Sequence, residues 1–347
     1  MTFGRPCTIP QSYVEKLNMP SPNMHVLSSA PEAENKDYSD GLFFTAAIKL
    51  SSILHNVLDS CYGQNLGFDA PESIASSISC LLDGQNQLNE WRLQLLPSLG
   101  FRIWDSPMSA EDVEKMNRDY IIYHRFNIVL SVRYNNLRIL LHRRRLESFV
   151  EGFWVDEAIT THDKRLMKQM DLGSVESCVE SAISIISTVH CIMMSGGWRR
   201  ELLGAWNFSL YYTFNAALVI FVSLIVGSKE RDNNPALWSV VCHSRPYMDM
   251  AVEAIRRLDS GNRVVERCGE YLSQLSFILG SMNLDVSDFN NWANLNLSAE
   301  FPAEIFNSQE TESLGSLDWG EFMVGQDLDF LGRLFNQPQN GVDGVLQ

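Results

Sequence analysis

Cysteine is the residue type with the most versatile chemistry in this sequence, and seven occur, at positions 7, 61, 80, 178, 191, 242 and 268. A structural zinc site takes two thiolates roughly two to four residues apart on one tight turn. The closest two, Cys178 and Cys191, are thirteen residues apart, so the spacing predicts no zinc site. The odd number, the apolar residues around these two and the lack of a secretory signal favour buried, reduced thiols in an intracellular protein.

Residue patterns for catalysis and for phosphate binding are missing from the sequence. It contains no nucleophile elbow, no His-Glu-x-x-His pair and no carboxylate-rich metal motif. The glycine turn at residues 195–198, SGGW, lies between two expected helices, whereas a phosphate-binding glycine loop follows a strand. The sequence therefore predicts no enzymatic activity, no cofactor and no catalytic or metal-binding residue.

The C-terminal part of the sequence combines acidic and apolar residues in a pattern that indicates binding to a partner protein. Residues 285–347 carry eleven acids against one base, Arg333, a net charge of −10 out of −15 for the whole chain. Within them, SLDWGEFMVGQDLDFLGRLF at 316–335 sets apolar residues among the acids. We expect this tail to be mostly disordered alone and to form an amphipathic helix on a basic, grooved partner. The expected contacts are Trp319, Phe322, Leu328, Phe330, Leu331 and Phe335. The alternative is that this cluster docks back on the chain's own core.

Direct contact with nucleic acid is disfavoured by the charge of the chain. The 284 residues before Asp285 hold 26 bases and 31 acids, a net charge of −5. Phosphate contacts require a concentration of Lys and Arg, which this distribution does not provide. We therefore expect no direct nucleic-acid contact from this chain.

Helical periodicity dominates the sequence from about residue 41 to residue 283. Apolar residues recur at three-to-four spacing, and no alternating strand pattern of useful length appears. Residues 1–40 are expected to be an irregular segment. The pattern predicts an all-α fold with helices at residues 42–62, 71–96, 110–149, 175–195, 205–226, 247–258 and 264–282.

A basic cluster lies near the end of the expected helix 110–149. Arg143, Arg144 and Arg145 follow His142 directly. Cations suit the C-terminal end of a helix dipole, so a solvated helix end is the expected role of the three arginines, with nuclear import or contact with acidic partners as the alternative. His142 is expected to be a surface or half-buried residue, with a titrating switch as the alternative.

The run from Leu202 to Ser228 contains no charged residue over 27 positions. Its length would allow it to span a membrane. Asn207, Asn215 and Thr213 interrupt it, however, and its neighbours have the amphipathic pattern of helices in water. We expect a helix buried at the centre of a helical domain. A membrane-anchored protein is the alternative.

Four stretches resemble the regulatory middle domain of fungal transcription factors of the zinc binuclear cluster class. They are FGRPCTIPQSYVEKLNMP at 3–20, LSVRYNNLRILLHRRRL at 130–146, ESCVESAISIISTVH at 176–190 and LLGAWNFSLYYTFNAALVIF at 202–221. The first is similar to that family's Gly-Arg-Pro turn, and the last to its buried apolar helix. Their order and spacing carry the resemblance, which covers most of residues 1–282. Arg144 stands where the family often has Pro, which leaves this helix free to continue to Phe149.

The resemblance implies a nuclear transcription regulator built from three parts. Residues 1–40 would hold the Gly-Arg-Pro turn, 41–283 the C-terminal portion of the helical regulatory domain, and 284–347 a candidate activation segment. The family's zinc cluster and basic linker would precede Met1, which we expect to lie within a longer ancestral chain, so zinc is expected only there. Implied partners are a coactivator or the general transcription machinery, a small-molecule effector, and a second copy of the chain through a face left uncovered. A helical protein-binding scaffold is a further alternative.

Overall fold

The computed structural model of the protein describes residues 32–62, 74–95, 103–152, 162–229, 231–232 and 235–281, and these form helices and connections without a strand. The predicted all-α fold is confirmed. The predicted tail contacts, Trp319 to Phe335, lie outside the described residues. In chain order the elements are α2 (Glu32–Tyr62), α3 (Ile74–Leu95), α4 (Ala110–Glu114), η3 (Arg118–Tyr120), α5 (Ile121–Gly152), α6 (His162–Ser195), η4 (Gly197–Leu203), α7 (Trp206–Lys229), α8 (Pro235–Cys242), α9 (Arg245–Leu258) and α10 (Arg263–Ser281).

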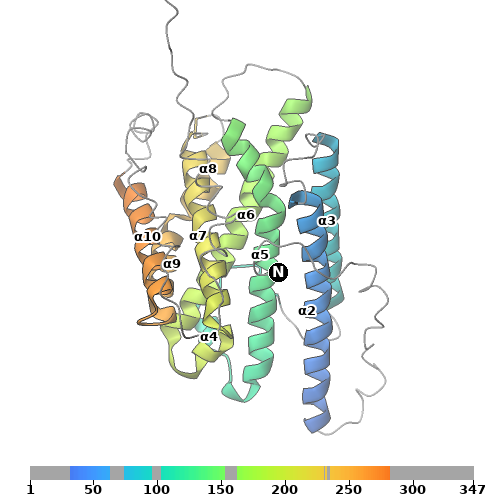
Figure 1. The fold of residues 1–347 in the computed structure, drawn as a ribbon, viewed down its shortest axis with the longest axis vertical. Helices are drawn as coiled ribbons and strands as arrows, with labels where there is room; N and C mark the ends of the chain where they lie inside the picture. The colour runs from blue at the N-terminus through green and yellow to red at the C-terminus, as the bar shows by residue number, and fades with distance from the viewer. Residues whose placement is uncertain are drawn as a thin grey trace, which may run out of the picture.

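The long helix α5 lies between two hydrophobic clusters. One face, with Ile128 and Ile139, packs into a cluster shared with α6, α7, α9 and α10. The opposite face, with Tyr134 and Leu141, packs against α2 and α3. Figure 1 shows the result, with α2 and α3 on one side of α5 and the other long helices on the other side. Both faces of α5 are therefore buried, and they include polar residues such as Asn127, Ser131 and Asn135 as well as apolar ones.

Helix α7 is enclosed by other helices, as the uncharged run predicted. It packs along α6 and α9 and also contacts α5, α8 and α10. Two segments are long and apolar enough to cross a membrane, Met170–Ser195 and Trp206–Ser228, and 89% of the apolar window in the second is buried inside the protein. Thr213 and Ser223 within it are fully buried. The apolar character of α7 is therefore accounted for by its position in the core.

The predicted helix 110–149 is interrupted, which corrects that expectation. Ser109 caps α4, since its hydroxyl accepts from the Asp112 backbone N–H at 3.2 Å while the Asp112 carboxylate accepts from the Ser109 N–H at 3.0 Å. Asn117 then caps a new start, because its side-chain oxygen accepts from the Asp119 N–H at 3.1 Å. This second cap starts η3, and the helix resumes as α5 at Ile121. A polar cap inside an apolar periodicity is the signal that the pattern missed.

Other boundaries also differ from the predictions. Helix α2 begins at Glu32, inside the segment expected to be irregular up to residue 40. Helix α6 begins at His162, thirteen residues before the predicted start, and continues through Gly173. The short helix α8 was not predicted. The absence of a proline at position 144 predicted that the helix continues to Phe149, and α5 continues three residues further, to Gly152.

Candidate functional site

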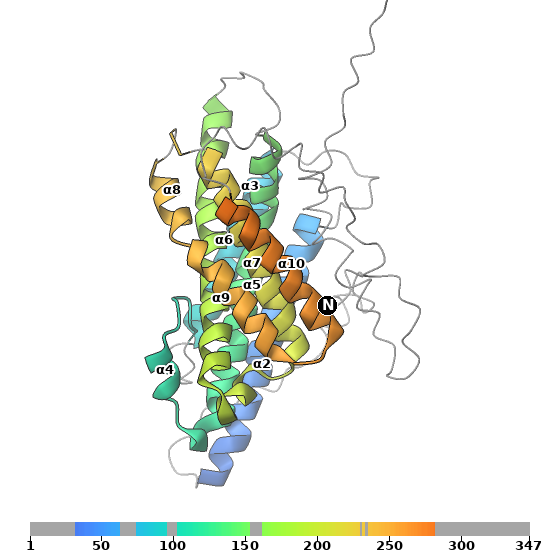
Figure 2. The same cartoon turned by 90° about the vertical axis from the view of Figure 1, so that its left-hand side faces the viewer.

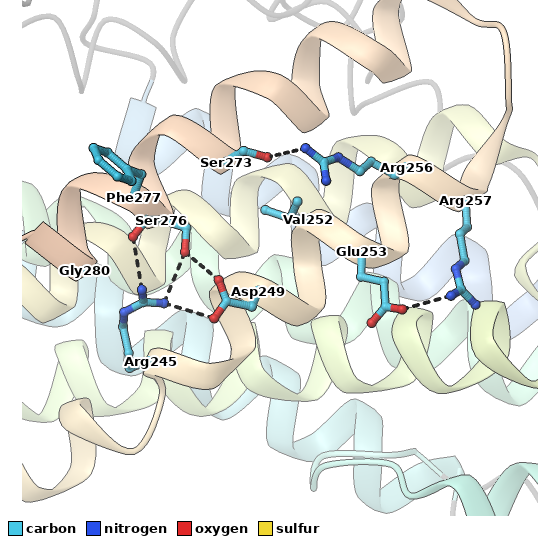
Figure 3. Close-up of a pocket in the computed structure, with 10 residues that line it drawn as sticks. All are labelled: Arg245, Asp249, Val252, Glu253, Arg256, Arg257, Ser273, Ser276, Phe277 and Gly280. Carbon is cyan, nitrogen blue, oxygen red and sulfur yellow. Dashed lines mark hydrogen bonds and ion pairs between the residues drawn. The ribbon is translucent and has the colours of Figure 1, made fainter.

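The described residues contain a groove between α9 and α10 with a volume of about 740 Å³ (Figure 3). Both helices are amphipathic, and their apolar sides pack against α6 and α7. Polar side chains remain along the outer line where the two helices meet. The residues that line the groove are Arg245, Asp249, Val252, Glu253, Arg256, Arg257, Ser273, Ser276, Phe277 and Gly280.

A tight turn brings α9 and α10 alongside each other. Gly261 has a φ of 91°, a left-handed conformation that glycine adopts without strain. The Asn262 side-chain oxygen then accepts from the Val264 N–H at 3.0 Å and caps the start of α10. The antiparallel pair that follows is visible in Figure 2.

Arg245, Asp249 and Ser276 form a hydrogen-bonded network at one end of the groove. Arg245 Nη1 donates to Ser276 Oγ at 3.2 Å, and Arg245 Nη2 donates to the Ser276 carbonyl at 3.0 Å. The Ser276 hydroxyl donates to Asp249 Oδ1 at 2.6 Å. Arg245 and Asp249 also pair directly at 3.5 Å. This network joins α9 to α10. The charges of Arg245 and Asp249 balance each other within it.

A second pair of charges lies at the opposite end of the groove. Glu253 Oε1 accepts from Arg257 Nη2 at 2.9 Å, and Glu253 Oε2 lies 3.0 Å from His190 Nε2 of α6. The hydrogen bond with His190 lowers the pKa of Glu253, and the positive charge of Arg257 adds to this effect, although burial opposes it. Glu253 is therefore ionised at neutral pH and balances Arg257.

Arg256 differs from the other two groove arginines. Its Nη2 donates to Ser273 Oγ at 2.9 Å, and no carboxylate of the described residues lies within ion-pair distance of it. Its aliphatic stem lies over Gly269, where an added Cβ would stand 3.2 Å from Arg256 Cγ. Phe277 of the same groove is 76% exposed. The groove thus presents an uncompensated guanidinium and a bare aromatic ring, a combination that suits an anionic, aromatic ligand.

No pattern in the sequence predicted this groove. Its members on α9 follow helical spacing on the outward face, at positions 245, 249, 253, 256 and 257, and those on α10 do the same at 273, 276, 277 and 280. Each set alone is typical of a solvated helix face. The two sets form a groove only when α9 and α10 lie side by side. The tight turn at Gly261 is the feature of the sequence that indicates this arrangement.

The basic cluster predicted to be a solvated helix end is buried, which corrects that expectation. Arg143 and Arg145 are 7% and 6% exposed. Arg143 pairs with Glu147 at 3.2 Å, Arg144 donates to the Cys61 carbonyl, and Arg145 Nη2 lies 2.6 Å from Asp171. Because α6 begins at His162 rather than at residue 175, its added N-terminal part, which includes Asp171, lies against this cluster.

His142 is also buried, contrary to the expected surface or half-buried position. One ring nitrogen lies 3.2 Å from Ser174 Oγ and the other 2.9 Å from Gln85 Oε1. Burial, together with the charge of Arg138, lowers the pKa of His142 to about 4. The imidazole is therefore neutral at physiological pH and joins α3, α5 and α6.

The described part of the chain contains no arrangement of side chains suited to a metal ion. No group of three or more His, Cys, Asp or Glu residues there is arranged to hold a metal ion. Burial raises the pKa of Cys178 and Cys268 to about 12, which makes both thiols unreactive near neutral pH. Cys61 and Cys80 lie in contact, although nineteen residues separate them in the sequence.

Comparisons with known proteins show similarity to two fungal transcription factors. The chain is 24% identical over 277 residues to Transcription factor FBD3 of Gibberella moniliformis, and 25% identical over 285 residues to Transcription factor FBD3 of Fusarium pseudograminearum. Each match covers 80% of this chain and 35% of the relative, so the chain spans about a third of the length of the curated relatives it matches. No protein-family model matches the chain. No solved structure matches it.

Proposed function

We propose that the protein is a nuclear transcription regulator of the fungal zinc-cluster class, composed of a helical regulatory body and an acidic activation tail. The observation that carries the proposal is the similarity to two transcription factors over 80% of the chain. The buried position of α7, which the resemblance to this class implied, agrees with it. DNA contact and any zinc cluster would require residues outside this sequence. The body itself has no enzymatic role in this proposal.

The activation tail acts by contacting a coactivator or the general transcription machinery. Its net charge of −10 over residues 285–347 keeps the apolar side chains accessible and speeds encounter with a basic partner. Trp319, Phe322 and Phe330 then supply the contacts that hold the complex, because aromatic residues dominate the energy of such interfaces. The ordering of the segment on binding lowers the affinity and allows rapid exchange of partners.

The helical body restrains this tail through the α9–α10 groove. The groove holds an uncompensated Arg256 and an exposed Phe277, which complement an acidic segment rich in aromatic residues. Gly280 lines the groove, and the chain leaves α10 one residue later at Ser281. Asp318 follows 37 residues after Ser281, and a coil of that length spans about 33 Å, which is sufficient to reach any part of the groove. An effector that occupies the groove would release the tail.

A reporter assay in cells tests the activating role of the tail. Residues 285–347 are fused to a heterologous DNA-binding domain, and transcription from its target site is measured. We expect activation by the fusion and loss of most of it in the triple variant Trp319→Ala, Phe322→Ala and Phe330→Ala. A matched triple variant, Leu297→Ala, Ile305→Ala and Phe306→Ala, controls for loss of apolar residues outside the acidic cluster. An inactive fusion, or equal activity of the two triple variants, would overturn the proposal.

A further inference from the structure

Two cysteine thiols meet where the end of α2 approaches α3. Cys61 Sγ and Cys80 Sγ lie 2.8 Å apart, closer than two sulfur atoms in non-bonded contact and beyond a covalent S–S bond of about 2.05 Å. Cys61 is 7% exposed, whereas Cys80 is half-buried. The proposed transcriptional role makes no use of this pair, so any chemistry it has goes beyond that function.

The surroundings hold the two sulfur atoms in this position. The Cys61 carbonyl accepts from the guanidinium of Arg144 on α5, and the Tyr62 hydroxyl donates to the Leu140 carbonyl at 2.7 Å. These contacts tie the last turn of α2 to α5. The Cys80 thiol also lies 3.1 Å from Ser60 Oγ. Both cysteines therefore sit on helices that pack on a common partner, and their contact needs no movement of either helix.

A metal ion does not explain the pair. Two thiolates on one zinc ion lie about 3.8 Å apart, since each Zn–S bond is about 2.3 Å and the geometry is tetrahedral. The observed 2.8 Å separation leaves no room for an ion between the sulfur atoms. Within the described residues no further His, Cys, Asp or Glu completes a metal site around them.

We propose that Cys61 and Cys80 form a site of oxidative modification. Reaction with hydrogen peroxide would join the two residues in a reversible disulfide. The more accessible partner, Cys80, reacts first with hydrogen peroxide: its thiol gives up a proton, the sulfur attacks one peroxide oxygen and the O–O bond breaks. Cys80 becomes a sulfenic acid, and the other oxygen takes up the proton and leaves as water. Cys61 Sγ then attacks Cys80 Sγ, the S–O bond breaks, and the departing oxygen takes the Cys61 proton as a second water. Two thiols are oxidised, one peroxide is reduced and two waters are released.

The roles of the two cysteines follow from their environments. Burial, together with a hydrogen bond to Cys80, raises the pKa of Cys61 to about 12, so Cys61 does not react with peroxide itself. Its contact with Cys80 at 2.8 Å allows it to attack a sulfenic acid there and lose its proton in the same step. Cys61 is thus the resolving residue and Cys80 the sensing one. In a compartment that keeps thiols reduced, the disulfide is a transient state that returns to the dithiol. As long as the disulfide is present, it links α2 covalently to α3, and both of these helices pack against α5.

Mass spectrometry of the intact chain tests the proposal. The reduced protein is treated with hydrogen peroxide at a few equivalents, unfolded and alkylated with N-ethylmaleimide. We expect a loss of two mass units and five alkylated cysteines out of seven, with full recovery of seven after dithiothreitol. The tryptic peptide 50–92 contains both residues, and a second cleavage after Glu72 separates Cys61 from Cys80. The two halves remain linked only if the disulfide has formed between them.

Single variants distinguish this pair from general oxidation. Cys61→Ser and Cys80→Ser should each abolish the linked peptide, and Cys61→Ser should leave a sulfenic acid on Cys80 that a dimedone probe captures. Cys268→Ser removes a buried thiol elsewhere and should leave the link unchanged. Circular dichroism checks that each variant keeps its helices. Oxidation of Cys80 to sulfinic acid without a link, or seven free thiols after peroxide, would overturn the proposal.

Discussion

Arg145 of α5 and Asp171 of α6 form a buried ion pair, with Arg145 Nη2 2.6 Å and Nε 2.8 Å from Asp171 Oδ1. The two side chains are only 7% and 12% exposed. Burial raises the pKa of Asp171 even though the charge and the hydrogen bond of Arg145 oppose this effect. The desolvation of the carboxylate outweighs its attraction to the guanidinium, so we expect the pair to contribute little net stability to the fold.

Removing one member of this pair should cost more than replacing both. Asp171→Ala leaves Arg145 buried without a counter-ion and should lower the free energy of unfolding by about 3 kcal/mol or more. The double variant Arg145→Met with Asp171→Leu fills the same space with apolar groups and should lie within about 1 kcal/mol of the original chain. Urea unfolding followed by circular dichroism measures both. A double variant as unstable as Asp171→Ala would show that the pair itself contributes net stability.

The burial of His142 predicts that the free energy of unfolding decreases in mild acid. Its pKa is about 4 in the folded protein, because burial and the charge of Arg138 disfavour the imidazolium, and about 6.5 in the unfolded chain. The unfolded chain thus binds a proton first as the pH falls. The contribution of His142 is fully present above about pH 6.5 and is lost as the pH falls toward 4.

The variant His142→Gln isolates this effect from the many carboxylates of the chain. Between pH 7 and pH 5 the original protein should lose about 2 kcal/mol more stability than His142→Gln, since glutamine does not titrate. Parallel pH profiles for the two proteins would show that His142 does not become charged on unfolding. Hydrogen bonds to Ser174 and Gln85 explain why the neutral form fits the site.

The sequence predicted the elements whose signals are local. The uncharged run forms the enclosed helix α7 as predicted, because its signal depends on neighbouring residues alone. Arg143 and Arg145 were misplaced because their burial depends on α6, which extends thirteen residues further back than its apolar pattern suggested. The polar stretch at 162–174 gave no reason to expect a helix that covers α5.

The α9–α10 groove and the Cys61–Cys80 contact could not be predicted for a related reason. Each brings together residues from two helices, and the relative rotation of two helices is set by packing rather than by either sequence. Arg256 and Phe277 are ordinary exposed residues on their own helices. Their combination exists only once the turn at Gly261 has joined α9 to α10.

Two glycines within helices should respond in opposite ways to alanine. A Cβ on Gly227 of α7 would lie 3.1 Å from Val241 Cγ1 and 3.3 Å from the Trp238 ring of α8. Gly227→Ala should therefore push α8 away and cost about 1–3 kcal/mol. Gly173 of α6 has no atom within 4 Å of such a Cβ, so Gly173→Ala should stabilise by up to about 1 kcal/mol through helix propensity. Thermal unfolding separates the two, and a shift of the same sign for both would contradict the close packing of α8 on α7.

The enclosed position of α7 predicts how the chain behaves without detergent. Phe221 is fully buried among other helices, so Phe221→Ala should leave a cavity and cost about 3–5 kcal/mol in urea unfolding. The original chain should remain in the supernatant after high-speed centrifugation. Sedimentation with membranes, together with little effect of Phe221→Ala, would instead favour α7 as a membrane span.

Restraint of the tail by the groove predicts that groove variants increase transcription. In a fusion of the full chain, residues 1–347, to a heterologous DNA-binding domain, Arg256→Ala with Phe277→Ala removes the uncompensated cation and the exposed ring. The reporter signal should rise several-fold toward that of the tail alone. The change acts on the body, so the isolated tail fusion should keep its activity. Immunoblots of both fusions establish that protein levels are equal.

Charge removal elsewhere on the body provides the control for this experiment. Lys115 is exposed and pairs only weakly with Glu111 at 3.8 Å, so Lys115→Ala lowers the net charge by the same amount as Arg256→Ala without touching the groove. It should leave the reporter signal unchanged. An equal rise with Lys115→Ala would mean that overall charge, rather than the groove, restrains the tail. The proposed activation and the proposed restraint involve separate parts of the chain, so the experiment can reject one without the other. If the isolated tail is active but the groove variants have no effect, the groove is not the surface that binds the tail. The activating function of the tail would then still stand.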